Sequence, residues 1–178
     1  MTTKIISSPH KNIILTKLEH QGGSNDCGPA TAATVINSLR KTNLNSKALA
    51  QKMNKPRKVG ILPIIRRIPD WMTFPWGMVD IFHEYGLYAS WKINSSFDYL
   101  KESMVQGKIV MPIVGSWRPL WSHVMTLLVC SPGKHWGFAN TQHELPEIFW
   151  VQDHIFRRQW RVMGNLLVEV YGTKDANK

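Results

Sequence analysis

Apolar residues recur along this chain at two spacings, which separate helices from strands. Ala32, Val35, Ile36 and Leu39 follow one another at the three- and four-residue spacing of a helix with one buried face. The continuous apolar run at residues 124–129 is instead typical of a buried strand. The pattern therefore predicts both kinds of element.

Capping and breaking residues set the expected boundaries of these elements. The predicted helices cover residues 27–40, 46–54, 75–85, 96–107 and 153–160. The predicted strands cover residues 13–18, 87–93, 108–114, 123–130, 136–140, 148–151 and 165–171. Residues 55–74, rich in Pro and Gly, are expected to form a loop with at most a short helical turn. Helices come early and strands gather late, which is the order of an α+β fold. We expect one domain over residues 1–178, with 1–12 and 173–178 flexible.

The segment before the first long helix carries the clearest chemical signal. It reads Gln21-Gly-Gly-Ser-Asn-Asp-Cys27-Gly-Pro-Ala, so Cys27 opens the helix and Ser24, Asn25 or Asp26 can cap it. A thiol at a helix N-terminus lies at the positive end of the helix dipole, which favours the nucleophilic thiolate. Backbone N–H groups there can also hold an oxyanion, and the Gln21 side chain can supply a second donor.

A cysteine nucleophile needs a base, and His123 has the best context among the seven histidines. It follows a loop and opens an apolar strand, and the next strand ends at Asn140. Adjacent strands would bring Asn140 back toward His123, where its amide oxygen can accept the imidazole N–H. Asp153 is the rival for this orienting role, although its position suits a helix N-cap better.

These motifs resemble the papain-like cysteine peptidases of the C39-like group, which includes the peptidase domains that process bacteriocin leader peptides. The resemblance rests on Gln21, the run Asn-Asp-Cys-Gly-Pro-Ala-Thr around Cys27, Ser-His-Val at His123 and Phe-Ala-Asn-Thr at Asn140, and it extends over residues 14–170. The group usually carries Asp-Pro where this chain has Asn140 and Thr141.

The resemblance implies a papain-like fold in which a helical N-terminal part, with the nucleophile at a helix N-terminus, packs on a C-terminal antiparallel sheet. It also implies a thiol-dependent hydrolase that cleaves a peptide or isopeptide bond, with Cys27, His123 and Asn140 as catalytic residues and Gln21 in the oxyanion hole. A transpeptidase or amidase with the same chemistry is the first alternative, and a non-catalytic peptide-binding module is the second. No metal or organic cofactor is implied.

Two tryptophans flank the loop before His123. Trp117 and Trp121 belong either to the core or to the wall of a peptide groove, and the sequence favours neither. His135 and His143 lie near Cys130, but their spacing matches no zinc pattern.

Composition narrows the partners and the compartment. The 178 residues carry a formal charge of +10, which we interpret mainly as solvated basic faces. No nucleic-acid-binding motif accompanies these charges, so we do not expect the protein to bind nucleic acid. The two cysteines form no disulfide framework, and no apolar run reaches the length of a membrane span. A peptide or protein substrate and a cytoplasmic location are expected, with export by a non-Sec route as the alternative. The sequence indicates no oligomeric state.

Overall fold

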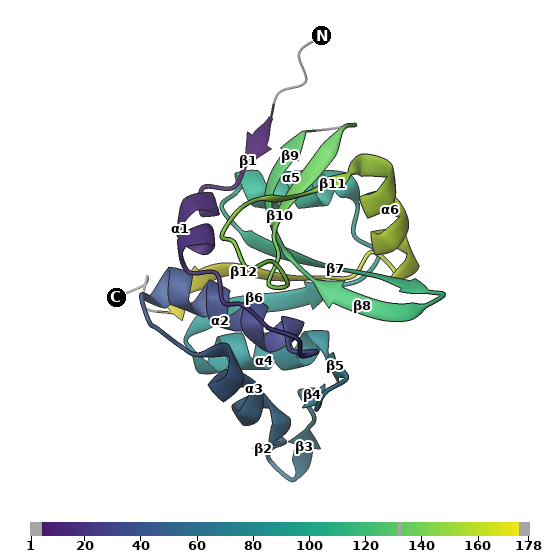
Figure 1. The fold of residues 1–178 in the computed structure, drawn as a ribbon. Coiled ribbons are helices and arrows are strands. Elements are labelled where there is room, and N and C mark those ends of the chain that lie inside the picture. Colours follow the sequence, from purple (N-terminus) through teal and green to yellow (C-terminus); the bar gives the residue numbers. More distant parts are fainter. Residues whose placement is uncertain (1–4, 132, 175–178) are drawn as a thin grey trace.

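Two four-stranded antiparallel sheets form the framework of the protein in a computed structural model that describes residues 5–131 and 133–174 (Figure 1). The first sheet has the order β1-β9-β10-β11, formed by Ile6–Ser7, Thr126–Ser131, His135–Ala139 and Phe149–Gln152. The second has the order β6-β12-β7-β8, formed by Leu87–Lys92, Leu167–Thr173, Ile109–Trp117 and Leu120–Val124. All paired strands in both sheets run antiparallel.

Six helices surround these sheets in the described part of the chain. They are α1 (Lys11–Thr16), α2 (Cys27–Arg40), α3 (Ser46–Asn54), α4 (Pro75–Glu84), α5 (Phe97–Val105) and α6 (Asp153–Val162). Helix α2 packs against α3 and α4, and α4 in turn packs against β6 and β12. Figure 1 shows α2, α3 and α4 together below the sheets, with α6 on the opposite side near β7 and β8. The protein is thus a mixture of helices and antiparallel sheet, as the sequence predicts in outline.

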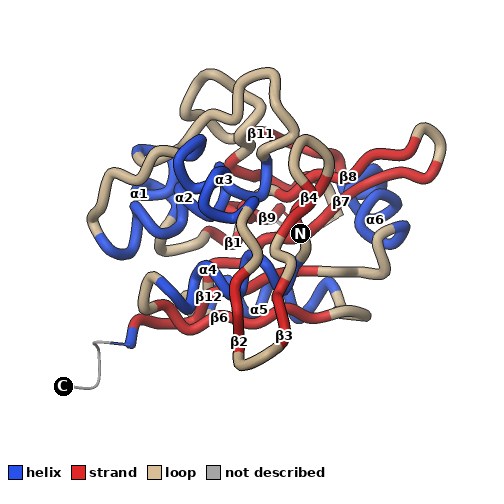
Figure 2. The backbone as a smooth tube through the Cα atoms, turned by 90° about the horizontal axis from the view of Figure 1, so that it is seen from below, coloured by secondary structure: helices blue, strands red, loops and turns tan. Residues whose placement is uncertain are grey.

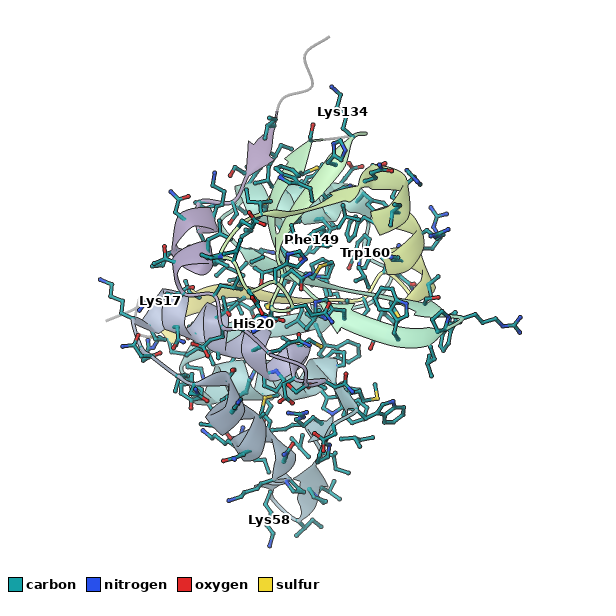
Figure 3. All side chains as sticks on the ribbon, viewed as in Figure 1. Lys17, His20, Lys58, Lys134, Phe149 and Trp160 are labelled. Carbon is teal, nitrogen blue, oxygen red and sulfur yellow. The ribbon has the colours of Figure 1, made fainter. Side chains whose placement is uncertain are left out.

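The core is divided into two apolar clusters. One joins α2, α3 and α4 to the second sheet and includes Val35, Ile36, Phe82 and Val168, all completely buried. The other lies between α5, α6 and the first sheet and includes the buried rings of Trp136, Phe138, Phe156 and Trp160. Trp160, labelled in Figure 3, belongs to α6. The strand β7 contributes to both clusters, which places the β7–β8 hairpin between the two halves of the core.

Two of the predicted strands differ from the structure. The predicted helices from residue 27 onward are present, whereas the predicted strand at 13–18 is helix α1. Only Ile14 of the apolar run Ile13–Leu15 is fully buried, and a short apolar run does not distinguish a strand from a helix. The predicted strand at 123–130 is two strands, β8 and β9, separated at Met125.

Parts of the two ends that were predicted to be flexible have regular secondary structure where the structure describes them. Residues 6–7 form β1, which pairs with β9, and Lys11 begins α1; residues 1–4 lie outside the described residues. Thr173 ends β12, and the Lys174 N–H donates to the Gly86 carbonyl at 2.8 Å; residues 175–178 again lie outside. Both described ends therefore make backbone hydrogen bonds, and their flexibility stays a prediction.

Residues 55–74 form two small hairpins instead of a loop. Arg57–Val59 (β2) pairs with Leu62–Ile64 (β3), and Arg67–Ile68 (β4) pairs with Met72–Thr73 (β5). In the tube view of Figure 2 the β2–β3 hairpin extends away from the sheets. The second hairpin packs against the start of α2, because β5 and α2 are in contact. Among the described residues, no helix is both long and apolar enough to cross a membrane.

Candidate active site

Cys27 is the first residue of α2, as the sequence predicts. Asp26 occupies the N-cap position, but its side chain makes no capping hydrogen bond and instead pairs with the Arg67 guanidinium at 2.6 Å. Pro29 has no N–H, so the backbone N–H groups of Cys27 and Gly28 are the donors at this helix end without a side-chain cap. Such donors can stabilise an anion next to the thiol.

Gly28 lets the second hairpin approach the helix closely. A Cβ atom at Gly28 would lie 2.5 Å from the Cβ of Thr73 in β5. A larger residue there would push β5 away from the thiol. The glycine after the cysteine therefore has a packing role beside the site.

His123 and Asn140 come together from two different sheets. His123 lies on β8 opposite Val114 of β7, and Asn140 directly follows β10. The His123 Nε2 and the Asn140 Oδ1 are 2.8 Å apart, and both residues are buried. Because the amide oxygen only accepts, Nε2 carries the proton and Nδ1 is left to accept one. The contact that the sequence predicts is present.

Cys27 and His123 line one small cavity of about 30 Å³. Its other walls include Trp71, Met72 and Thr73 from the second hairpin. Within the described residues no hydrogen bond joins the Cys27 thiol to the imidazole. The thiol and the imidazole thus face the same small cavity without a hydrogen bond between them.

Burial dominates the electrostatics of both groups. It raises the pKa of the Cys27 thiol above its usual value, although hydrogen bonds to the backbone of Val124 and Gly28 and the charge of Arg67 act in the opposite direction. Burial also lowers the pKa of His123, and the hydrogen bond that its ring donates to Asn140 offsets only part of this. Burial therefore opposes the thiolate that the helix N-terminus was expected to stabilise, and it favours the neutral forms of both groups.

Gln21 is held beside Asn140, in a different cavity from Cys27. Its Oε1 accepts a hydrogen bond from the Thr141 hydroxyl at 2.8 Å, and its Nε2 donates to the Ser24 carbonyl at 2.8 Å. Its backbone N–H also donates to the Thr141 carbonyl at 2.9 Å. The amide has a fixed orientation, and the second Nε2 hydrogen is free of these contacts.

A much larger cavity of about 690 Å³ opens on the other side of His123. Trp121 lines it together with His123 and Asn140, whereas Trp117 does not line it and is 69% exposed. The two tryptophans thus differ in position although they flank the same hairpin turn. Figures 1 and 2 both show this β7–β8 hairpin projecting from the body of the protein.

Asp153 does not orient His123 and is not the N-cap. Gln152 occupies the N-cap of α6, and Asp153 accepts hydrogen bonds from Trp136 Nε1 at 2.7 Å and Arg157 Nε at 2.6 Å. Its carboxylate therefore fixes α6 to the first sheet. Over the described ranges, no group of three or more His, Cys, Asp or Glu side chains could hold a metal ion.

Two features near the site escape sequence reasoning. Arg67 is 2% exposed and is paired with the residue before the nucleophile, but it belongs to a segment predicted as a loop. Phe149 and Trp150 line the large cavity, and their strand was predicted without any link to His123. Arg67, Phe149 and Trp150 are all far from Cys27 and His123 in the sequence, so no sequence pattern linked them to the site.

Comparison with known proteins supports the fold. No protein-family model matches the sequence, and no curated protein is significantly similar to it. A crystal structure of a protein from Bacillus anthracis, described as a candidate C39-like peptidase, matches with a TM-score of 0.69 at 13% identity. The match covers 94% of this chain and 97% of that chain. The chain therefore has a fold similar to that of a C39-like peptidase.

Proposed function

We propose that this protein is a thiol peptidase that cleaves a peptide or isopeptide bond through an acyl-enzyme. The observation that supports this most strongly is the arrangement of Cys27 at the start of α2, in one cavity with His123, whose Nε2 is held by Asn140 at 2.8 Å. A nucleophile, a base and a residue that orients the base are the three parts such chemistry needs.

In the first half of the proposed reaction, the Cys27 sulfur attacks the substrate carbonyl carbon. His123 Nδ1 takes the thiol proton during the attack, since burial favours the neutral forms of both groups beforehand. The resulting oxyanion is stabilised by backbone N–H groups at the start of α2 and by the free Nε2 hydrogen of Gln21. The C–N bond then breaks, His123 returns the proton to the leaving amine, and a thioester remains on Cys27.

In the second half, His123 removes a proton from water, and the resulting hydroxide adds to the thioester carbonyl. The C–S bond breaks, and the thiolate of Cys27 recovers its proton from His123. Asn140 keeps the imidazole in the tautomer that both halves require. The protein needs no metal or organic cofactor for these steps.

A transpeptidase or amidase would use the same thioester but a different acceptor. The wide cavity beside His123 is the observation that keeps this alternative open, because an amine could enter where water otherwise attacks. Hydrolysis with and without added amine nucleophiles, followed by mass analysis of the products, separates the two reactions.

Cleavage of a diverse peptide library tests the proposal. We expect wild-type protein to release defined products, and Cys27→Ala to release none. Cys130→Ala is the matched control because Cys130 is completely buried in β9, away from the site. Equal cleavage by wild type and Cys27→Ala would overturn the proposal.

A further inference from the structure

The large cavity beside His123 has a lining unlike the rest of this basic protein. Aromatic rings from Trp121, Phe149 and Trp150 and the aliphatic side chain of Ile155 form its walls. Carboxamides supply much of its polar surface, from Gln142, Gln152 and Gln159 among others. None of the described residues that line it is Asp, Glu, Lys or Arg, although the chain carries 34 such residues, 22 basic and 12 acidic.

The walls of this cavity are held in place before any ligand binds. The Trp150 indole packs over Gly137, where an added Cβ would lie 3.1 Å from Cζ3 of the ring. The His135 ring, also on β10, meets Trp150 edge-on, with centroids 6.5 Å apart. The Phe149 ring, near the centre of the view in Figure 3, packs against His143 with centroids 4.6 Å apart. Rigid aromatic walls reduce the entropic cost of binding an apolar side chain.

The position of the cavity indicates which part of a substrate reaches it. His123 and Asn140 line this cavity, whereas Cys27 lines the small cavity and not this one. In acyl transfer the carbonyl carbon bonds to the thiol, and the departing amine lies next to the imidazole that protonates it. Residues on the leaving side of the scissile bond therefore extend from His123 toward the large cavity.

We propose that this cavity is the binding site for a bulky, uncharged apolar side chain on the leaving side of the cleaved bond, preferably an aromatic one. The inference rests on the proposed function and specifies its substrate class. The volume of about 690 Å³ lies within the range of roughly 300–1,000 Å³ that is usual for ligand pockets, and it accommodates an aromatic side chain with its flanking backbone. The carboxamides of Gln142, Gln152 and Gln159 bind that backbone.

Peptides that share one acyl part and differ only in the first residue after the scissile bond test this directly. We expect kcat/KM to be at least about tenfold higher with Phe or Leu than with Asp, Lys or Gly at that position. Trp150→Ala should remove most of this preference. Deacylation, measured from the common thioester, should not change because the leaving segment has already departed.

Two further variants sharpen the test. Trp91→Ala is the matched control, since Trp91 on β6 is 42% exposed, close to the 49% of Trp150, and does not line this cavity. Gln159→Glu adds one negative charge to the wall at nearly constant shape, so it should raise kcat/KM for Lys at the test position roughly fivefold. A flat preference in active wild type, or equal effects of Trp150→Ala and Trp91→Ala, would overturn the inference.

A binding measurement keeps the inference separate from the proposed function. Cys27→Ala protein retains every residue of the large cavity and should bind a peptide with N-terminal Phe more tightly than its N-terminal Ala or Lys counterpart in calorimetry. Selective binding with no turnover in wild type would overturn the peptidase proposal alone. Binding of the three peptides with equal affinity would overturn the inference, whatever the activity.

Discussion

The proton on His123 is the residue-scale feature on which the proposed chemistry depends most. Burial lowers the pKa of His123, and its neutral form is the base that accepts the Cys27 proton. Protonating this imidazole at acid pH removes the base. We therefore expect kcat/KM to hold through neutral pH and to fall only below the ordinary histidine range, as a pH–rate profile would show.

Replacing Asn140 by Asp should shift this profile in a defined direction. A carboxylate beside Nε2 favours the imidazolium and raises the pKa of His123, so the acid limb should move to higher pH while activity at neutral pH is retained. Asn140→Ala should lower activity without unfolding the protein. An acid limb that does not move in Asn140→Asp would contradict the assignment of Asn140 as the partner of His123.

The two cysteines should be alkylated at different rates because they differ in burial. Cys27 is half-buried at a cavity, whereas Cys130 is completely buried, and burial raises its pKa to about 11. Brief alkylation with iodoacetamide followed by peptide mapping should label Cys27 first. Preferential labelling of Cys130 would contradict the described position of Cys27.

The same residues show how much of the proposed site the sequence could predict. The placement of Cys27, His123 and Asn140 was predictable because each lies at or near the end of a helix or strand, where side-chain position follows from regular geometry. The protonation states were not predictable, since desolvation depends on how the second hairpin and the sheets close over the thiol.

At the scale of elements, the ion pair between Asp26 and Arg67 fastens the second hairpin to the start of α2. The Arg67 side chain is 1% exposed and that of Asp26 is 17% exposed. Removing one partner of a buried pair leaves the other charge without compensation, at a cost of about 3–5 kcal/mol. Arg67→Met should therefore lower the free energy of unfolding by about this amount in urea titrations.

The double variant Asp26→Asn/Arg67→Met separates charge from packing. It removes both charges, so we expect it to recover much of the stability that Arg67→Met loses. A double variant no more stable than Arg67→Met would show that the guanidinium acts mainly through packing.

Elements with long periodic patterns were predictable, and short ones were not. Helix α2 follows from the apolar spacing of Ala32 to Leu39 and ends at Arg40 as expected. The hairpins within residues 57–73 have strands of two or three residues, too short for any period, and their Pro and Gly content resembled a loop. The prediction of a strand where α1 lies was wrong because three consecutive apolar residues fit a helix as well as a strand.

At the scale of the whole molecule, the chain carries a formal charge of +10, whereas none of the described residues that line the large cavity is Asp, Glu, Lys or Arg. Long-range attraction should therefore speed the approach of acidic peptides without contributing to binding in the cavity. We expect acidic residues placed far from the cleaved bond to raise kcat/KM at low salt, and this advantage to disappear near 0.5 M salt, where screening is strong. A salt-independent advantage would point to a direct contact instead.

The central claim is that Cys27 forms a thioester with a peptide substrate, which requires Cys27 on α2 and His123 on β8 to act together. The most direct measurement is rapid acid quenching during turnover, followed by mass spectrometry of the intact protein and its peptides. We predict an added mass equal to the acyl part of the substrate on the Cys27 peptide, and its absence in His123→Ala and Cys27→Ala. Turnover without any adduct on Cys27 under single-turnover conditions, or turnover that survives Cys27→Ala, would contradict the account.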